Sequence, residues 1–174
     1  AGKEGRRRRV LAVPDLGVLP KKLLEEILER NHVVLNEKTV ILESYKRSAT
    51  CLETILKHSV VEDEVSVLSE AEYEKYPLVL PLAECFLEKD IRLTYEEYHA
   101  CIGAAENYAK ANENYQFNLT KIKGFHNIQI TCFEGKWCMI SKNRAPAIHF
   151  VIHHPKLRYA LENMVLPIRD DEIE

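Results

Sequence analysis

Four consecutive arginines, Arg6 to Arg9, are the strongest chemical feature of the sequence. Adjacent guanidinium groups suit phosphates, because each carries a permanent charge and several N–H donors. The run therefore fits a nucleic-acid arm, a nuclear localisation patch or a contact with an acidic membrane surface. A solvated linker that follows a preceding domain explains it equally well. On each interpretation residues 1–9 form a flexible basic arm, and deleting them should barely change thermal stability.

A second basic region covers residues 118–160, which contain seven lysines and arginines and only one acid, Glu134. A helix is expected to start at Pro155, and its free backbone N–H groups would favour an anion there. Aromatic residues interleave with the basic ones, but strand alternation places Trp137 in the core and leaves Phe133 for base stacking. The candidate anion contacts outside the arginine run are Lys136, Lys142, Arg144, His153, Lys156 and Arg158.

The five cysteines lack the paired spacing of a disulfide scaffold. Four lie in apolar patterns, which predicts reduced, buried thiols in an intracellular protein, cytoplasmic or nuclear. Cys132 and Cys138 flank a turn and, with His126, suggest a metal site. A two-residue turn at Glu134 and Gly135 would direct the two thiols to opposite faces, whereas a three-residue turn would change this. We predict no metal site here.

Motifs that mark common catalytic centres are absent from the sequence. It contains no nucleophile elbow, phosphate-binding Gly-rich loop, dinucleotide fingerprint or zinc-protease helix. We therefore expect no cofactor and favour a protein that is not an enzyme. An enzyme whose catalytic residues are scattered along the chain remains an alternative.

The elements around these residues predict an α+β protein. Its 174 residues, 46% hydrophobic and 29% charged, suit a globular domain, and no apolar run reaches the roughly 20 residues of a membrane span. We expect a single domain at 10–168, with a mostly antiparallel C-terminal sheet packed against amphipathic helices, and an acidic tail at 169–174. Strands are expected at 10–13, 117–122, 127–133, 136–141 and 147–152, a hairpin at 32–42, and helices from Pro20, around 45–56, at 69–76, at 94–112 and from Pro155.

Charge is divided into blocks along the chain. Residues 1–9 have a net charge of +4, residues 62–97 hold eleven acids against three bases, and residues 118–160 have a net charge of +6. We interpret the blocks as differently charged surfaces, which would also allow self-association between opposite poles.

Two functional hypotheses follow from these blocks. The first is a non-enzymatic regulatory or interaction module of a larger intracellular protein, which contacts nucleic acid or an acidic protein surface through the basic arm and the basic C-terminal sheet. The second is a ligand-sensing domain of a regulator that binds a small anion. Its pocket would lie between the C-terminal sheet and the helix 94–112, near Lys142, Arg144 and His153.

Overall fold

The computed structural model of the protein describes residues 5–82, 90–120, 126–144 and 147–173, with side chains up to residue 164. The strands in these ranges are β1 (Gly5–Leu11), β2 (Ser59–Ser66), β3 (Tyr115–Thr120), β4 (Ile128–Phe133), β5 (Trp137–Lys142) and β6 (Ile148–Ile152). The helices are α1 (Lys21–Arg30), α2 (Leu35–His58), α3 (Glu70–Lys75), α4 (Tyr95–Ala111) and α5 (Pro155–Ile173), with a short 3-10 helix η1 (Leu16–Val18).

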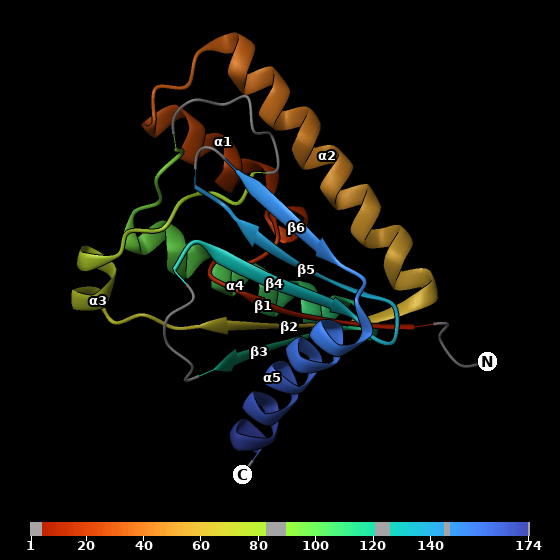
Figure 1. Cartoon of the computed structure of the whole chain (residues 1–174). Helices are drawn as coiled ribbons and strands as arrows, with labels where there is room; N and C mark the ends of the chain where they lie inside the picture. The colour runs from red at the N-terminus through yellow and green to blue at the C-terminus, as the bar shows by residue number, and fades with distance from the viewer. Residues whose placement is uncertain (1–4, 83–89, 121–125, 145–146, 174) are drawn as a thin grey trace.

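All six strands form one sheet in the order β3-β2-β1-β4-β5-β6 (Figure 1). The pairs β1–β2 and β2–β3 are parallel, and the pairs β1–β4, β4–β5 and β5–β6 are antiparallel. The predicted α+β class is thus confirmed. Of the strands expected in the C-terminal sheet, β3 is parallel to β2, whereas β4, β5 and β6 are antiparallel as expected. The whole sheet is mixed, however, because an unexpected parallel half precedes them.

The arginine run occupies the central strand of this sheet. Strand β1 lies between β2 and β4, with Arg8 paired to Glu62 and Arg9 paired to Asp63 in the register of β1 and β2. The expected flexible arm is therefore wrong for residues 5–9, while residues 1–4 lie outside the described residues. The physical reason is the neighbouring strand, whose consecutive acids at 62–64 supply the opposite charge that lets arginines enter a sheet.

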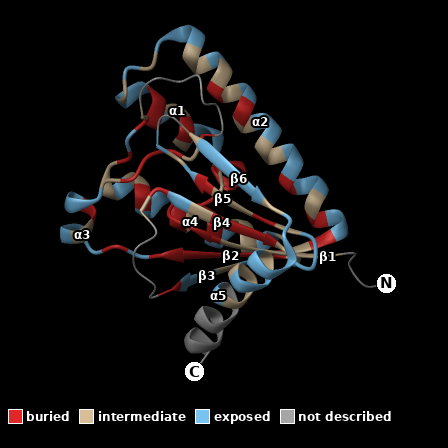
Figure 2. Cartoon of the chain, viewed as in Figure 1, coloured by how far each residue is buried: buried red, intermediate tan, exposed pale blue. Residues whose placement is uncertain are grey.

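Helices cover both faces of the sheet. Helices α1, α2 and α4 share the larger hydrophobic core with one face, which includes Leu11, Val61 and Tyr115. On the other face a smaller cluster of Val10, Ile130, Cys132 and Cys138 lies against Leu161 of α5. Figure 2 shows the buried residues concentrated on the central strands and on the inner sides of the helices. None of the helices in the described part of the chain is long and apolar enough to cross a membrane.

Helix α2 replaces the hairpin expected at residues 32–42. Helix α1 ends at Arg30, His32 takes a left-handed conformation with φ of 52°, and α2 begins at Leu35. The β-branched residues of this segment lie on a helix because one side of it is buried along Ile41, Ser44, Leu52 and Leu56. Packing against the sheet has overridden local strand propensity. The 24-residue helix that results forms one wall of the site described next.

Candidate anion-binding pocket between the sheet and α2

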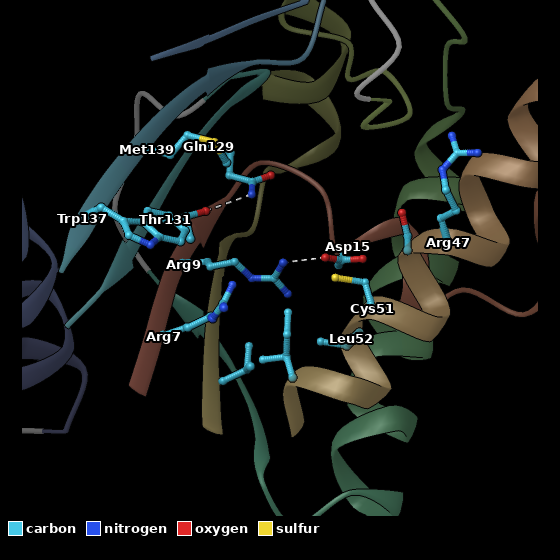
Figure 3. Close-up of a pocket in the computed structure, with 13 residues that line it drawn as sticks. Arg7, Arg9, Asp15, Arg47, Cys51, Leu52, Gln129, Thr131, Trp137 and Met139 are labelled. Carbon is cyan, nitrogen blue, oxygen red and sulfur yellow. Dashed lines mark hydrogen bonds and ion pairs between the residues drawn. The ribbon is translucent and has the colours of Figure 1, made fainter. Parts of the chain in front are cut away.

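A cavity of about 320 Å³ lies between α2 and the sheet. Its volume is at the lower end of the range for small-molecule sites. Strands β1, β2, β4 and β5 supply one wall, α2 supplies the other, and Asp15 lies between them (Figure 3). The lining residues are Arg7, Arg9, Asp15, Arg47, Ser48, Cys51, Leu52, Ile55, Val61, Gln129, Thr131, Trp137 and Met139.

Strand alternation divides the arginine run between the two faces of the sheet. Side chains two apart on a strand share a face, so Arg7 and Arg9 project toward α2 and line the cavity. Arg6 and Arg8 project to the opposite face, and both form ion pairs with Glu62. The four arginines that were expected to act together therefore have separate surroundings.

Arg9 is bound within a buried network. Its Nε and Nη2 atoms donate to the two oxygens of Asp63 at 2.6 and 2.7 Å, and its Nη1 atom donates to Asp15 at 2.5 Å. Tyr115 donates its hydroxyl to Asp63 at 2.6 Å, and Asp15 accepts from the backbone N–H of Gly17 at 2.7 Å. Burial opposes the charge of Arg9, but attraction by Asp63 and Asp15 outweighs it and raises the Arg9 pKa well above its ordinary value. Arg9 thus has a structural role.

Arg7 differs from Arg9 in having no carboxylate partner among the described residues. Its guanidinium lies 4.8 Å from the ring centre of Phe133 and 5.6 Å from that of Trp137, within cation–π range. Its Nε atom is buried and forms no hydrogen bond. Burial lowers the pKa of Arg7, an effect that the nearby Cys51 thiol partly opposes. A half-buried guanidinium at a cavity, with a donor atom that has no partner, is suited to binding an anion.

The remaining lining is largely apolar, with a few polar groups. Leu52 and Ile55 lie on α2, Val61 lies on β2, and the half-buried Trp137 and Met139 lie on β5. On β4 the amide of Gln129 donates to the hydroxyl of the buried Thr131 at 3.1 Å (Figure 3). Cys51 faces the cavity from α2, whereas Arg47 extends away from Arg7 and Arg9. The lining residues of α2 were not predicted from the sequence. Arg47, Cys51 and Ile55 are nevertheless spaced by four, so they share one helix face.

The turn between β4 and β5 explains why Trp137 lies in this cavity. Phe133 pairs with Trp137 across a three-residue turn, and Gly135 takes a φ of 76° within it. The two-residue turn assumed from the sequence would have placed Trp137 on the opposite face with Cys132. Phe133 is not an open platform for base stacking either, because Arg7 and Lys136 both lie over its ring at 4.8 Å.

The same turn brings Cys132 and Cys138 together. They are direct partners in the β4–β5 register, and their sulfur atoms are 2.8 Å apart on the face covered by α5. The expectation that they point apart is therefore wrong. His126 does not join them but stacks on Tyr76, with ring centres 4.2 Å apart. Within the described ranges, no group of three or more His, Cys, Asp or Glu side chains is arranged to hold a metal ion.

The basic residues of the C-terminal region do not converge on one point. Lys136 precedes β5 and Lys142 ends it, so about 20 Å of strand separates them. Arg144 bonds to Asp90 at 3.2 Å beside the Lys142 end, while Arg158 bonds to Glu162 at 3.3 Å in α5. His153 and Lys156 are exposed near the Lys136 end. None of Lys142, Arg144 and His153 lines the cavity between the sheet and α2.

The chain matches no protein-family model, and comparisons with curated proteins and with solved structures give no match. We therefore characterise the protein by its own fold and by this cavity. It is an α+β protein with a mixed six-stranded sheet and a cavity into which the central strand projects an arginine without a carboxylate partner in the described part of the chain.

Proposed function

We propose that this protein is a ligand-sensing domain that binds a small anion in the pocket between the sheet and α2. The observation that carries the proposal is the guanidinium of Arg7, half-buried at the cavity with a buried Nε atom that donates to nothing. A charge-assisted hydrogen bond from Arg7 to an anion would offset the cost of burying that group. The enclosing apolar residues would strengthen this attraction by excluding water.

The location of Arg7 supports a small ligand rather than a macromolecule. Strand β1 is the central strand, and α2 closes the opposite side of the cavity, so a nucleic-acid backbone has no extended surface to follow. Contact with nucleic acid or an acidic protein through the C-terminal basic residues stays a prediction. Its support is weaker, since those residues are divided between two ends of the β5–β6 hairpin and Arg144 and Arg158 already pair with acids.

Two natural reporters allow the proposal to be tested on the unmodified chain. Trp137 is the only tryptophan, and it lines the pocket from β5. Cys51 is an exposed thiol that lines the pocket from α2. A bound anion should change the Trp137 emission and slow the alkylation of Cys51 by iodoacetamide, with the same half-saturating concentration for both signals.

The experiment titrates a panel of anions: inorganic phosphate, phenyl phosphate, succinate, phenylacetate and 4-methylpentanoate. At least one should move both reporters. Arg7→Gln should weaken that binding at least tenfold, the loss expected for a charge-assisted hydrogen bond. Arg47→Gln is the matched control, because Arg47 lies at the same pocket but points away from Arg7, and it should change binding less than threefold. Equal effects of the two variants, or no response to any anion, would refute the proposal.

A further inference from the structure

We infer that the ligand of this pocket is a small monocarboxylate with an apolar body, held by its carboxylate on Arg7. The inference rests on the proposed function and names the class of ligand. It is carried by three properties of the cavity: its balance of charges, the geometry of the free guanidinium and the apolar surfaces around it.

The charge balance favours a single negative charge. Three arginines and one aspartate line the pocket. Arg9 is already matched by Asp63 and Asp15, and Arg47 is directed away from the other two arginines. Arg9, Asp63 and Asp15 together carry one net negative charge, so Arg7 is the cation that faces the cavity without a carboxylate of its own among the described residues. A phosphate ester carries a charge of about −1.5 to −2 at neutral pH. Its excess charge would lie close to Asp15, with no further cation directed toward it in the described pocket.

The geometry of Arg7 favours a planar acid. Its guanidinium lies near the rings of Phe133 and Trp137, and its Nε atom donates no hydrogen bond. A carboxylate presents two oxygens in one plane, with the spacing of Nε and a terminal nitrogen of arginine. Forming both bonds would require the Arg7 side chain to turn its Nε atom, which is buried here, toward the cavity. A tetrahedral phosphate would use the same edge but leave its other oxygens among apolar side chains.

The apolar residues favour a hydrocarbon body behind the carboxylate. Leu52 and Ile55 line the cavity from α2, and Trp137 and Met139 line it from β5. Burying a few methylene or aromatic carbons between these walls contributes about 0.8 kcal/mol for each CH₂ group. A polar dicarboxylate such as succinate would gain little from these surfaces and would place its second charge against them.

The test compares compounds that share a shape and differ in the head group. Phenylacetate is set against its neutral amide, phenylacetamide, and against phenyl phosphate, with 4-methylpentanoate and succinate as the aliphatic pair. Affinities come from Trp137 emission and from isothermal titration calorimetry at pH 7. We expect phenylacetate or 4-methylpentanoate, or both, to bind. Phenylacetate should bind at least tenfold more tightly than phenylacetamide and phenyl phosphate, or 4-methylpentanoate at least tenfold more tightly than succinate. Arg7→Gln should remove the preference for phenylacetate over its amide without changing the amide affinity.

The outcomes separate this inference from the proposed function. Tighter binding of phenyl phosphate or succinate that Arg7→Gln abolishes would overturn the monocarboxylate and leave the anion site standing. Failure of every anion to bind would overturn both. The near-ultraviolet circular dichroism of Arg7→Gln, compared with that of the parent, shows that lost binding is not lost folding. Arg7→Lys provides a second variant. It keeps the positive charge but lacks the paired N–H donors of the guanidinium, so it should recover only part of the carboxylate affinity.

Discussion

Two arginines on β1, Arg7 and Arg9, face the same cavity with different partners. Arg9 gives three hydrogen bonds to two carboxylates, whereas Arg7 has only aromatic rings beside it and one buried donor atom without a bond. Removing one member of a buried ion pair leaves the other charge uncompensated, at a cost of about 3–5 kcal/mol. Removing an unpaired buried cation carries no such cost. The same substitution should therefore destabilise the protein far more at Arg9 than at Arg7.

We predict that Arg9→Met lowers the free energy of unfolding by about 3–5 kcal/mol, since Asp63 and Asp15 lose their partner. Arg7→Met should change it by less than about 1 kcal/mol, because the lost cation–π contacts are offset by relief from burying a charge. Urea denaturation followed by circular dichroism measures both. If Arg7→Met proved as damaging as Arg9→Met, Arg7 would be a structural residue and not one reserved for a ligand.

The cysteines allow a second prediction at the residue scale. Cys51 is exposed, whereas Cys101, Cys132 and Cys138 are buried. Burial raises the pKa of Cys101 to about 12 and also raises the pKa values of Cys132 and Cys138, so their reactive thiolate is scarce at neutral pH. Iodoacetamide should alkylate Cys51 in the native protein, and the three buried cysteines only after unfolding. Peptide mass spectrometry assigns the sites. Rapid labelling of Cys132 would show that α5 does not protect that face.

Sequence reasoning at this scale identified the arginines but not their separate roles. Arg7 and Arg9 differ because Asp63 and Asp15, distant in sequence, both reach Arg9. Likewise, one residue in the length of the β4–β5 turn decides which face Trp137 and Cys138 occupy. Both facts depend on register and tertiary pairing, which the residue pattern alone does not specify.

At the scale of elements, the sequence predicted those features that depend on neighbouring residues alone. Capping boxes at Ser69–Glu72 and Thr94–Glu97 begin α3 and α4, the helices expected at 69–76 and 94–112. The strands expected in the C-terminal third correspond to β3, β4, β5 and β6 with small shifts at their ends. Strand β2 was missed, because acids are poor strand formers by propensity, and two of its acids, Glu62 and Asp63, are stabilised by arginines of β1.

The cap of α4 leads to a pH prediction. Burial opposes ionisation of Glu97, but hydrogen bonds from Arg30 and Thr94 outweigh it and lower the Glu97 pKa. A lowered pKa stabilises the fold above the pKa of the unfolded chain, and the contribution is lost as pH falls through the folded value. Glu97→Gln should therefore cost about 1–2 kcal/mol at pH 7, the range for a capping or charged hydrogen bond. At pH 3, where less of the carboxylate is ionised, the cost should be smaller.

Urea denaturation of the parent and of Glu97→Gln at the two pH values measures this difference. Glu96→Gln is the control, since Glu96 lies in the same first turn of α4 but is exposed, and it should have little effect at either pH. A cost that persists unchanged at pH 3 would mean that the Glu97 carboxylate charge does not contribute to stability.

At the scale of the whole molecule, two of the charged segments in the sequence are packing partners rather than separate surfaces. The basic block at residues 6–9 and the acidic block at residues 62–64 are more than fifty residues apart, yet they lie side by side as β1 and β2. The net charge of a segment counts side chains on the surface and side chains in buried ion pairs alike. Only the strand order shows which of the two a charged segment forms. The flexible arm was inferred because the pairing acids are remote in sequence.

Deleting residues 1–9 tests this arrangement. The deletion would remove most of β1, and β2 and β3 would lose their connection through the sheet to β4, β5 and β6. Glu62 and Asp63, both buried, would lose the arginines that pair with them. We therefore expect the truncated chain to lose cooperative thermal unfolding and near-ultraviolet circular dichroism. As a control, Arg6→Thr with Arg7→Thr keeps the strand, and Arg8 and Arg9 still pair with the acids, so this variant should retain a cooperative transition. A truncated chain that unfolds cooperatively near the parent's midpoint would show that β1 is dispensable and restore the flexible arm.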